Sequence, residues 1–508
     1  MKLEEELKKL NIDLNQVIEN ALTKSEELLK LNKITEATIL LKQLLVVDPS
    51  NKNGLQLYGL ILYRQGKYLE SIDVQKKAIL ADENNPENHS NIALSYLHSG
   101  NVEEAKKEIE KAVEITPNDY NRLNNAGLIY RAAGDIDKSI SYFKNAIKIN
   151  PTNSIAWENL GSIYGSLKDL DEAKKCFEEA IKLNPDDLAA HVDLAYTYHL
   201  KGEWEKAWPE YEHRIEYWHS VGRNPGRFYD IYKPEKKLKK EDSVNGKNIV
   251  IYCEQGNGDI IQFARFIPKL IEKGANVFFH SPPELDSLLS TIPNLNVKLP
   301  EEYDYHCSIL SLPYLLDCMT SDKFLSNTPY FIADEEKKVD LSDYKETFNI
   351  GLCWAGNPGH PNDGNRSIYL KQFENIANMA NIKLFSLQKD LSKRVYTNLP
   401  GVEIDLTKDC DNLKIVDLSH LLSDYKATAN IIDSLDLVIT VDTSILHLAG
   451  SIGKETWALI PFNPDWRWTL EGEKTVWYES VKLFRQTNPG DWSDVIQKIE
   501  SELKTKVE

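Results

Sequence analysis

The chain has 508 residues, 42% of them hydrophobic, which is enough for about two to four domains with cores of their own. Its 78 acidic residues outnumber the 60 basic ones and give a formal net charge of −18, which argues against the broad basic surface of a nucleic-acid-binding protein. The six cysteines are scattered, with no C-x-x-C pair and no histidine at zinc-finger spacing, which indicates reduced thiols in a cytosolic protein.

Residues 1–16 begin with MKLEEELKKL and predict a charged amphipathic helix. This segment lacks the apolar centre of a secretion signal, and no later stretch reaches about 18 uninterrupted apolar residues. We therefore expect a cytoplasmic protein without a membrane-spanning segment.

A period of 34 residues runs through residues 17–217. Proline recurs at one phase, where Glu83 fills the one position that lacks it, and small residues recur at three other phases. Small residues let two antiparallel helices approach closely, and proline ends the second helix of each pair. This is the pattern of the tetratricopeptide repeat (TPR), and about six units predict an α-helical superhelix. The four phases contain Pro49, Pro117, Pro151 and Pro185; Gly59, Ala93, Gly127, Gly161 and Ala195; Gly66, Gly100, Gly134 and Gly202; and Ala78, Ala112, Ala146 and Ala180.

A further phase places Asn91, Asn125, Asn159 and Asp193 just before the small residue of each first helix. The concave face of such a superhelix usually binds an extended segment of another protein. Asparagine amides both donate and accept hydrogen bonds, so they can hold a peptide backbone without reading its side chains. Asparagine is also common at this position in ordinary repeats, which leaves a purely structural role open. A second copy of the chain is a further candidate partner.

Residues 218–246 include KPEKKLKKEDSVNG and predict a charged, solvated linker. Beyond the linker, apolar β-rich runs alternate with amphipathic helical stretches, which predicts two parallel sheets covered by helices on both faces. We expect the first sheet within residues 247–335 and the second within residues 348–508. Two such sheets facing each other would place the carboxyl ends of both on one cleft.

The stretch CEQGNGDIIQFARF, residues 253–266, lies at the expected edge of the first sheet. Gly256 and Gly258 would let a ligand approach the backbone of this turn closely. Asp259 fits either a general base or a simple cap of the helix that follows.

The stretch TVDTSILHLAGSIGK, residues 440–454, lies at the corresponding edge of the second sheet. Thr443 and Ser444 supply hydroxyls and free N–H groups at a helix N-terminus, which suits a phosphate. Simple N-capping by Asp442 or Thr443 is the alternative.

Other functional motifs are either missing from the sequence or only weakly indicated. A dinucleotide-binding G-x-G-x-x-G motif is missing because Ile261 occupies the place of the third glycine, and there is no Walker lysine and no G-x-S-x-G. The sequence DCD, Asp409 to Asp411, has the form of a metal-binding D-x-D motif, but matches of three residues are frequent by chance. We therefore predict no metal and no other cofactor.

Six ordered blocks of the second half resemble bacterial TPR proteins that carry a glycosyltransferase domain of the B type (GT-B), related to the heptosyltransferases. The blocks are EQGNGDIIQFAR (254–265), GLCWAGNPGHPNDGNRSI (351–368), FSLQK (385–389), LDLVITVDTSILHLAGSIGK (435–454), PFNPDWRW (461–468) and WYESVKLFRQ (477–486). The resemblance implies a GT-B fold of two Rossmann-like domains that face a cleft. Residues 247–335 would form the acceptor side and residues 348–508 the nucleotide-sugar side.

The resemblance also implies roles for individual residues. Asp259 matches the carboxylate that is proposed as general base in heptosyltransferases. Asp442, Thr443 and His447 match the turn that holds the donor diphosphate, although His447 would also fit a histidine packed beneath that turn.

Lys389 and Arg366 are candidates for neutralising the leaving diphosphate. Arg467 and Arg485 look like family features whose roles we cannot assign from the sequence. Three tryptophans leave a choice between core packing and stacking on a sugar or base: Trp354, Trp466 and Trp468.

The resemblance, together with the repeat array, implies a metal-independent, inverting glycosyltransferase that moves a sugar from a nucleotide-activated donor to a Ser or Thr hydroxyl of a protein held by the superhelix. The arrangement resembles the O-linked N-acetylglucosamine transferases and the bacterial flagellin glycosyltransferases. Two alternatives remain open: an acceptor that is a cell-surface saccharide or its lipid-linked precursor, and an inactive scaffold.

Overall fold

The computed structural model describes residues 13–222, 231–325, 329–360, 362–389, 394–395, 403–407, 410 and 413–507. The chain divides into two compact units, Met1–Ala190 and His191–Glu508, here called the repeat unit and the α/β unit. Most of the helix predicted over residues 1–16 lies outside the described residues, and the first described helix begins at Leu14. None of the helices in the described ranges is long and apolar enough to cross a membrane.

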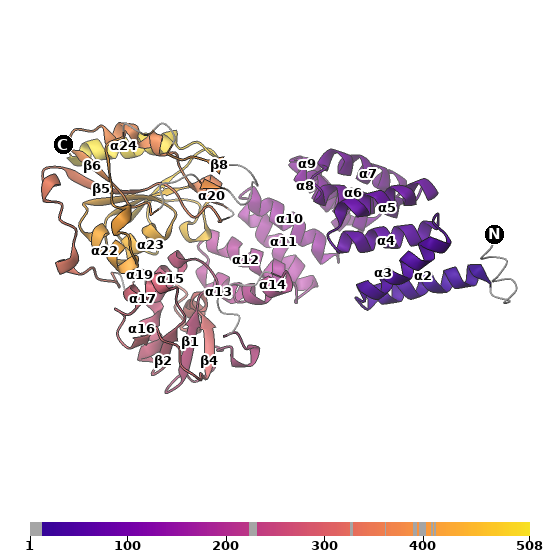
Figure 1. The fold of residues 1–508 in the computed structure, drawn as a ribbon, viewed down its shortest axis with the longest axis horizontal. Coiled ribbons are helices and arrows are strands. Elements are labelled where there is room, and N and C mark those ends of the chain that lie inside the picture. Colours follow the sequence, from indigo (N-terminus) through magenta and orange to yellow (C-terminus); the bar gives the residue numbers. More distant parts are fainter. Residues whose placement is uncertain are drawn as a thin grey trace. The chain divides into compact units, whose positions relative to one another are not determined.

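The repeat unit consists of helices that pack in consecutive antiparallel pairs (Figure 1). Their bounds are α2 Leu14–Lys30, α3 Ile34–Val47, α4 Lys52–Arg64, α5 Tyr68–Ala81, α6 Pro86–His98, α7 Val102–Ile115, α8 Tyr120–Ala132, α9 Ile136–Ile149, α10 Ser154–Ser166 and α11 Leu170–Leu183. Helix α12, Leu188–Leu200, runs from this unit into the next.

One phase of small residues permits the close approach of paired helices, as the sequence predicts. A Cβ at Gly127 of α8 would lie 2.6 Å from a ring carbon of Phe143 in α9, and a Cβ at Gly161 of α10 would lie 2.8 Å from the ring of Phe177 in α11. The Ser139 hydroxyl also donates a 2.6 Å hydrogen bond to the Gly127 carbonyl. A larger residue in this phase would force the two helices apart.

A second phase of glycines serves a different purpose from the close approach that we predicted. Gly66, Gly100 and Gly134 lie in the turns inside the helix pairs with φ between 73° and 83°, and a Cβ there would meet nothing within 4 Å. Backbone conformation is therefore the constraint, because this left-handed region favours glycine. Asn32 and Lys168 occupy the same phase where glycine is missing and also have positive φ.

The α/β unit begins at His191, inside the predicted repeat array of residues 17–217. Helices α13, Trp204–Tyr211, and α14, Arg214–Ser220, belong to this unit because the aromatic side chains of α13 and Ile215 of α14 are part of its core. The ring contacts join Trp204, Trp208 and Tyr211 to Phe263, Phe324, Trp466 and Trp477.

The predicted linker, residues 218–246, is less solvated than its charge indicates. Leu238 is buried, and its N–H donates to the His306 carbonyl at 2.9 Å. The Tyr303 hydroxyl donates to the Ile231 carbonyl at 2.5 Å. Much of the segment therefore packs along the β4 edge of the first sheet, where Lys237 forms a parallel bridge with His306. Residues 223–230 lie outside the described residues.

Two parallel sheets form the centre of the α/β unit. The first has the order β3-β2-β1-β4, with β1 Asn248–Tyr252, β2 Asn276–Phe279, β3 Leu295–Asn296 and β4 Tyr305–Ser308. The second has the order β12-β11-β10-β5-β6-β9, with β5 Phe348–Cys353, β6 Ile382–Ser386, β9 Ile415–Asp417, β10 Leu437–Val441, β11 Thr456–Ile460 and β12 Val481–Arg485. A separate antiparallel pair joins β7 Arg394–Val395 to β8 Glu403–Ile404.

Helices cover both faces of the second sheet: α24 lies on one face, and α22 and α23 lie on the other (Figure 1). The helices of this unit are α15 Asn257–Phe263, α16 Ile267–Glu272, α17 Pro283–Leu289, α18 Leu312–Leu315, α19 Ser321–Leu325, α20 Asp363–Arg366, α21 Glu374–Ala377, α22 Tyr425–Asp433, α23 Ser444–Ser451 and α24 Ser493–Val507. The arrangement is compatible with the predicted α/β class.

A buried ion pair joins α14 to the first sheet. The side chains of Arg214 and Glu254 are both 0% exposed, and the guanidinium lies 2.7 Å from the carboxylate. Arg214 also donates to Ser311 at 3.1 Å, and the Ser308 hydroxyl donates to Glu254. These contacts lie at the carboxyl ends of β1 and β4, where the strand order reverses.

We expect Glu254→Gln to lower the free energy of unfolding of the α/β unit by up to about 3–5 kcal/mol, because it removes the fully buried carboxylate of Arg214 and leaves only the more exposed Glu212, 3.1 Å away, to compensate the guanidinium. The matched control is Glu455→Gln, which breaks the exposed ion pair with Lys506 and should cost less than about 1 kcal/mol. Urea denaturation of the full chain measures both. Equal losses in the two variants would contradict a structural role of the buried pair.

Candidate functional site

The second sheet reverses its strand order between its central neighbours, β5 and β10. From β5 the chain proceeds outward to β6 and β9, and from β10 it proceeds outward to β11 and β12. Parallel sheets of this kind bind ligands outside the carboxyl ends of the strands at such a point. Here the two loops are residues 354–367 after β5 and residues 442–443 after β10.

Arg366 connects these two loops. Its Nη1 donates to the Asp442 carbonyl at 2.8 Å, and its Nε donates to Oδ1 of the buried Asp363 at 3.2 Å. A Cβ at Gly356 would lie 2.5 Å from Arg366 Nε, so this position has room only for glycine. The guanidinium is thus fixed at the turn where the sequence predicts a donor diphosphate.

The N-terminus of α23 lies in the same place. Thr443 is the residue before the helix, and its hydroxyl makes no capping hydrogen bond to the first turn. The hydroxyl instead lies 3.3 Å from the Thr440 hydroxyl. Ser444 accepts a 3.0 Å hydrogen bond from the Tyr425 hydroxyl, which itself accepts one from Asn257 at 3.3 Å. This chain of contacts joins the turn after β10 to the turn after β1.

Charged groups gather around Asp442. Burial raises the pKa of Asp442 to about 6, and the nearby Asp465 carboxylate adds to the effect while Arg366 opposes it. Burial also lowers the pKa of His360, in the loop after β5, with Arg366 contributing in the same direction. Carboxylates, a guanidinium and an imidazole therefore share this edge of the sheet.

Asp259 lies at the corresponding edge of the first sheet, in the first turn of α15. One carboxylate oxygen accepts the Gly256 N–H at 2.8 Å, and the other is bound by the guanidinium of Arg467. Burial raises the pKa of Asp259 above its ordinary value, and Arg467 opposes that shift. The helix cap that the sequence offered as an alternative is present, and the carboxylate also takes part in an ion pair.

Arg467 connects residues of the two sheets. Besides Asp259 it binds Asp465 at 2.7 Å and Gln262 at 2.8 Å, and its guanidinium lies 4.3 Å from the ring centre of Trp466. The residue is only 5% exposed. The sequence singled out Arg467 without a role, and it missed Asp465, because no spacing rule relates either of them to Asp259.

His447 is buried beneath the turn. Its Nδ1 lies 3.0 Å from the Tyr478 hydroxyl, and its ring stacks on Trp468 with centres 5.5 Å apart. Burial keeps the pKa of His447 well below its usual value. Helix α23 also fills the space beside Gly258, where a Cβ would lie 2.8 Å from His447 Cδ2. A Cβ at Gly256 would meet only the Asp259 carboxylate, at 3.6 Å.

The remaining predicted residues of the second sheet lie elsewhere. Lys389 follows β6 and is exposed, and the structure gives it no contact with Arg366 or Asp442 among the residues it describes. Arg485 donates to the carbonyls of Thr469 at 3.1 Å and Gly472 at 2.7 Å, which gives it a structural role in that loop. Asp409 and Asp411 of the D-x-D sequence lie outside the described residues.

The three tryptophans that the sequence left undecided are core residues. Trp354, Trp466 and Trp468 are between 1% and 3% exposed. Trp466 stacks on His199 of α12 with centres 4.1 Å apart. No ring of this group is exposed to stack on a sugar or base.

The predicted asparagine ladder connects neighbouring repeats. Asn125 donates to the Ser90 hydroxyl at 3.1 Å, and Asn159 donates to Asn124 at 3.3 Å. Asn91 and Asn159 are only 9% and 8% exposed. Asp193, the fourth member, belongs to the α/β unit, where its carbonyl accepts from Thr197 at 2.8 Å.

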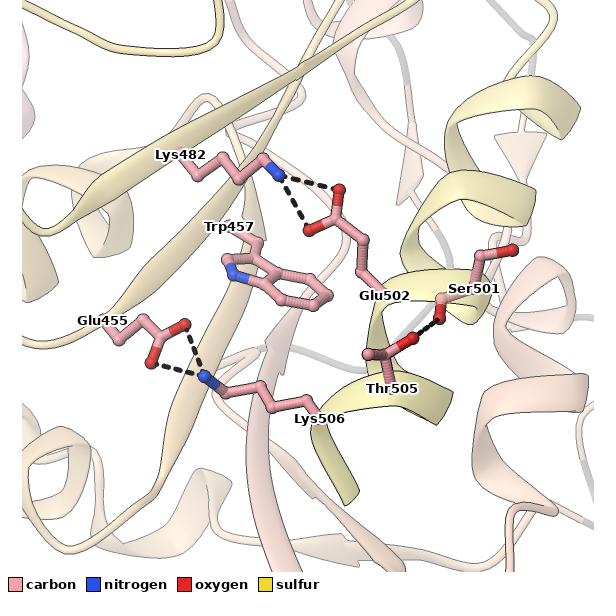
Figure 2. A pocket seen from close by; sticks show the side chains of 7 residues that line it. All are labelled: Glu455, Trp457, Lys482, Ser501, Glu502, Thr505 and Lys506. Carbon is pink, nitrogen blue, oxygen red and sulfur yellow. Dashed lines mark hydrogen bonds and ion pairs between the residues drawn. The ribbon is translucent and has the colours of Figure 1, made fainter. Parts of the chain in front are cut away.

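A shallow hollow of about 480 Å³ is lined by residues of β11, β12 and α24. Figure 2 shows its two ion pairs, Lys482 with Glu502 and Lys506 with Glu455, on either side of Trp457. Both cations are neutralised by carboxylates, and none of the predicted site residues lines this hollow.

Comparisons with known proteins support the repeat half of the chain. Sequence models described as tetratricopeptide repeat or TPR repeat match residues 22–89, 86–119, 127–168, 154–187 and 176–208. The chain therefore contains tetratricopeptide repeats, which supports a role in binding other proteins. A search of curated proteins finds no match to the chain.

Three solved structures with similarity to the chain are described here by their identity, TM-score and coverage. The chain is 20% identical to a chain of the APC/C hetero-tetramer Cut9-Hcn1, with a TM-score of 0.37, and the match covers 41% of each chain. It is 20% identical to TTC0263, a thermophilic TPR protein in Thermus thermophilus, with a TM-score of 0.33 and coverage of 35% and 98%. It is 23% identical to human IFIT1, with a TM-score of 0.36 and coverage of 42% and 53%.

We expect Gly258→Ala to lower the free energy of unfolding by about 1–3 kcal/mol, because the new methyl group would collide with His447 and press on the backbone of Ser444, 3.4 Å away. Gly256→Ala is the matched control and should change stability by less than about 1 kcal/mol, since only the Asp259 carboxylate lies near it. Thermal and urea unfolding measure both variants. A tolerated alanine at 258 would contradict the packing of α15 on α23.

We expect Asp442→Asn to stabilise the protein at pH 7 by about 2 kcal/mol. The folded-state pKa of Asp442, about 6, lies above the unfolded value near 4, so folding takes up a proton between these pH values. Stability is therefore lost as the pH rises through this window, and the asparagine variant avoids the loss. Urea denaturation at pH 4, 5, 6 and 7 should show that the variant has a higher free energy of unfolding than the wild type at pH 7 and that this difference disappears near pH 4.

Asp340→Asn is the control, because the pKa of Asp340 is shifted in the opposite direction to that of Asp442. A hydrogen bond from the Ser342 backbone lowers the pKa of Asp340, so the stability that this carboxylate contributes is lost as the pH falls. A gain for Asp442→Asn that is the same at every pH would contradict the shifted pKa.

Proposed function

We propose that the α/β unit is an inverting glycosyltransferase of the GT-B type, which moves a sugar from a nucleotide-activated donor to a hydroxyl group of a protein. The observation that carries this proposal is the joining of the two strand-order reversal points. Arg366 and the N-terminus of α23 lie at the second sheet, Asp259 lies in the turn after β1, and α15 packs on α23 between them. The contact from Asn257 through Tyr425 to Ser444 keeps the two turns together.

In this proposal Arg366 and the N–H groups at the start of α23 receive the donor diphosphate. A guanidinium and a helix N-terminus both stabilise the negative charge that grows on the leaving group. These groups provide the compensation within the protein, so the proposed transfer uses no metal ion. Thr443 and Ser444 border the same turn, while Lys389, exposed after β6, stays a predicted contributor.

Asp259 is the proposed general base. It takes the proton from the acceptor hydroxyl as the hydroxyl oxygen attacks the anomeric carbon and the bond to the nucleoside diphosphate breaks. Burial raises the pKa of this carboxylate and makes it more basic, while the Arg467 guanidinium opposes that shift. Arg467 is a positioning residue in this scheme, because it holds Asp259 from the side opposite Gly256.

The tetratricopeptide repeats make a protein the proposed acceptor. A repeat array binds extended segments of other proteins, and Asn91, Asn125 and Asn159 are the candidate contacts along it. The side-chain amide nitrogens of Asn125 and Asn159 already donate to neighbouring repeats, so these two residues would bind a peptide through their amide oxygens.

The engagement of Asp259 favours one competing function, an interaction scaffold without transferase activity. Both of its carboxylate oxygens have partners, Gly256 and Arg467. In that case the turn would serve only to cap α15 and to bind Arg467. The α/β unit would then catalyse no transfer, whether or not it binds a ligand.

We expect Asp259→Asn to lower transfer by about 10²- to 10⁴-fold and to change the affinity for the nucleotide sugar only a few-fold, because the base acts on the acceptor. The measurement begins with a thermal-shift panel of UDP, GDP, ADP, dTDP, CMP and their sugars, and continues with nucleotide release from the sugar that binds. The asparagine keeps the oxygen that accepts the Gly256 N–H, so the helix cap is preserved.

Asp491→Asn is the matched control, since Asp491 accepts the Ser493 N–H at 2.9 Å at the start of α24, away from the site. It should leave transfer unchanged. Normal turnover in Asp259→Asn would remove Asp259 from the mechanism. A wild-type protein that binds no nucleotide and releases none from any sugar would favour the scaffold.

A further inference from the structure

Two histidines and a glutamate meet where α12, α13 and α14 come together in the α/β unit. The ligand atoms of His191, Glu210 and His213 all lie within 4.8 Å of one another. His191 Nδ1 is bound to the Glu210 carboxylate, and the rings of His191 and His213 stack with centres 4.0 Å apart. Neither the repeat pattern nor the proposed transfer reaction assigns a purpose to this cluster.

The repeat unit contains an internal comparison for the first two residues. His89 and Glu108 lie three repeat lengths before His191 and Glu210, and they form the same contact, with His89 Nδ1 2.6 Å from the carboxylate. A histidine and a glutamate therefore join the two helices of a repeat at both places. This pair alone is explained by helix packing.

The third residue differs between the two places. Lys111 occupies the position that corresponds to His213, and its ammonium lies 3.0 Å from the Glu108 carboxylate. The repeat thus surrounds its glutamate with an imidazole and an ammonium group. At the later place the ammonium is replaced by a second imidazole, so the cluster contains three groups that can each bind a metal ion.

We propose that His191, Glu210 and His213 bind a divalent transition-metal ion of the zinc type, with water in the fourth position. Two imidazole nitrogens and a carboxylate form a ligand set that zinc uses in proteins, and imidazole ligands disfavour calcium and magnesium. Ligand atoms on one tetrahedral zinc ion lie about 3.3 Å apart. The ligand atoms of the present cluster lie within 4.8 Å of one another, so metal binding would require only small side-chain movements.

The ion would act as a structural clamp. His191 lies on α12, Glu210 on α13, and His213 directly precedes α14. A bound ion would therefore fix all three helices beside Arg214, the residue that joins them to Glu254. The inference does not depend on the proposed transferase activity, and its test requires no substrate.

The test is a titration of the full chain with ZnCl₂ after treatment with EDTA and a reducing agent, followed by metal analysis and thermal unfolding. We expect one zinc ion per chain in the wild type and a higher melting temperature with zinc. His213→Lys should weaken zinc binding by at least about ten-fold and abolish the shift. Its fold should be preserved, because Lys111 occupies the same position in a repeat. Cobalt should give a visible absorption band in the wild type that His213→Lys lacks.

Glu108→Gln is the matched control, because it breaks the corresponding pair in the repeat that has no third ligand, and it should bind zinc like the wild type. All variants keep the six cysteines, so zinc held by thiols would be the same in each. Equal zinc binding by the wild type and His213→Lys would mean an adventitious ion and would overturn the proposal. A wild type that binds no zinc would overturn it as well. If His213→Lys fails to fold, Glu210→Gln takes its place with the same expected loss.

Discussion

The α/β unit depends on the ion pairs of Arg467, whose charge is buried between the two sheets. A buried guanidinium is tolerated only when carboxylates replace the water that it loses. Arg467 is bound by Asp259 from the turn after β1 and by Asp465 from the loop after β11. The two turns therefore cannot separate without leaving a charge uncompensated, and this constraint holds together the groups that we propose for catalysis.

The same constraint, at Arg214, determines where the repeats end. The last helices of a repeat array usually have a polar outer face, which lets the array end in water. Helices α13 and α14 instead present tryptophans and a buried arginine, so they require the first sheet and Glu254 as partners. The division of the chain at His191, inside the repeat pattern, follows from this packing. It also explains why a segment with helical repeat spacing belongs to the core of a different fold.

The sequence predicted those features that depend on local spacing. The period of 34 residues was sufficient for the helix pairs, and parallel strands share an edge, so Arg366 and Asp442 could be expected to meet. The ion pair of Arg467 with Asp259 could not be predicted, because the residues are 208 positions apart and nothing in either neighbourhood selects the other. For a related reason the sequence assigned Gly258 only to the close approach of a ligand. In the structure His447 of α23 lies beside it, and no local pattern indicates that packing.

In the proposed transfer Asp259 would combine two roles that the sequence presented as alternatives. An ionised carboxylate has about four acceptor positions, so the Gly256 N–H and the Arg467 guanidinium leave capacity for an acceptor hydroxyl. The cap fixes the carboxylate at the helix start, and the ion pair sets its basicity, since burial raises the pKa of Asp259 while Arg467 lowers it. In the proposed transfer, capping therefore supports catalysis: the contacts that hold the carboxylate also determine the pH at which it can accept a proton.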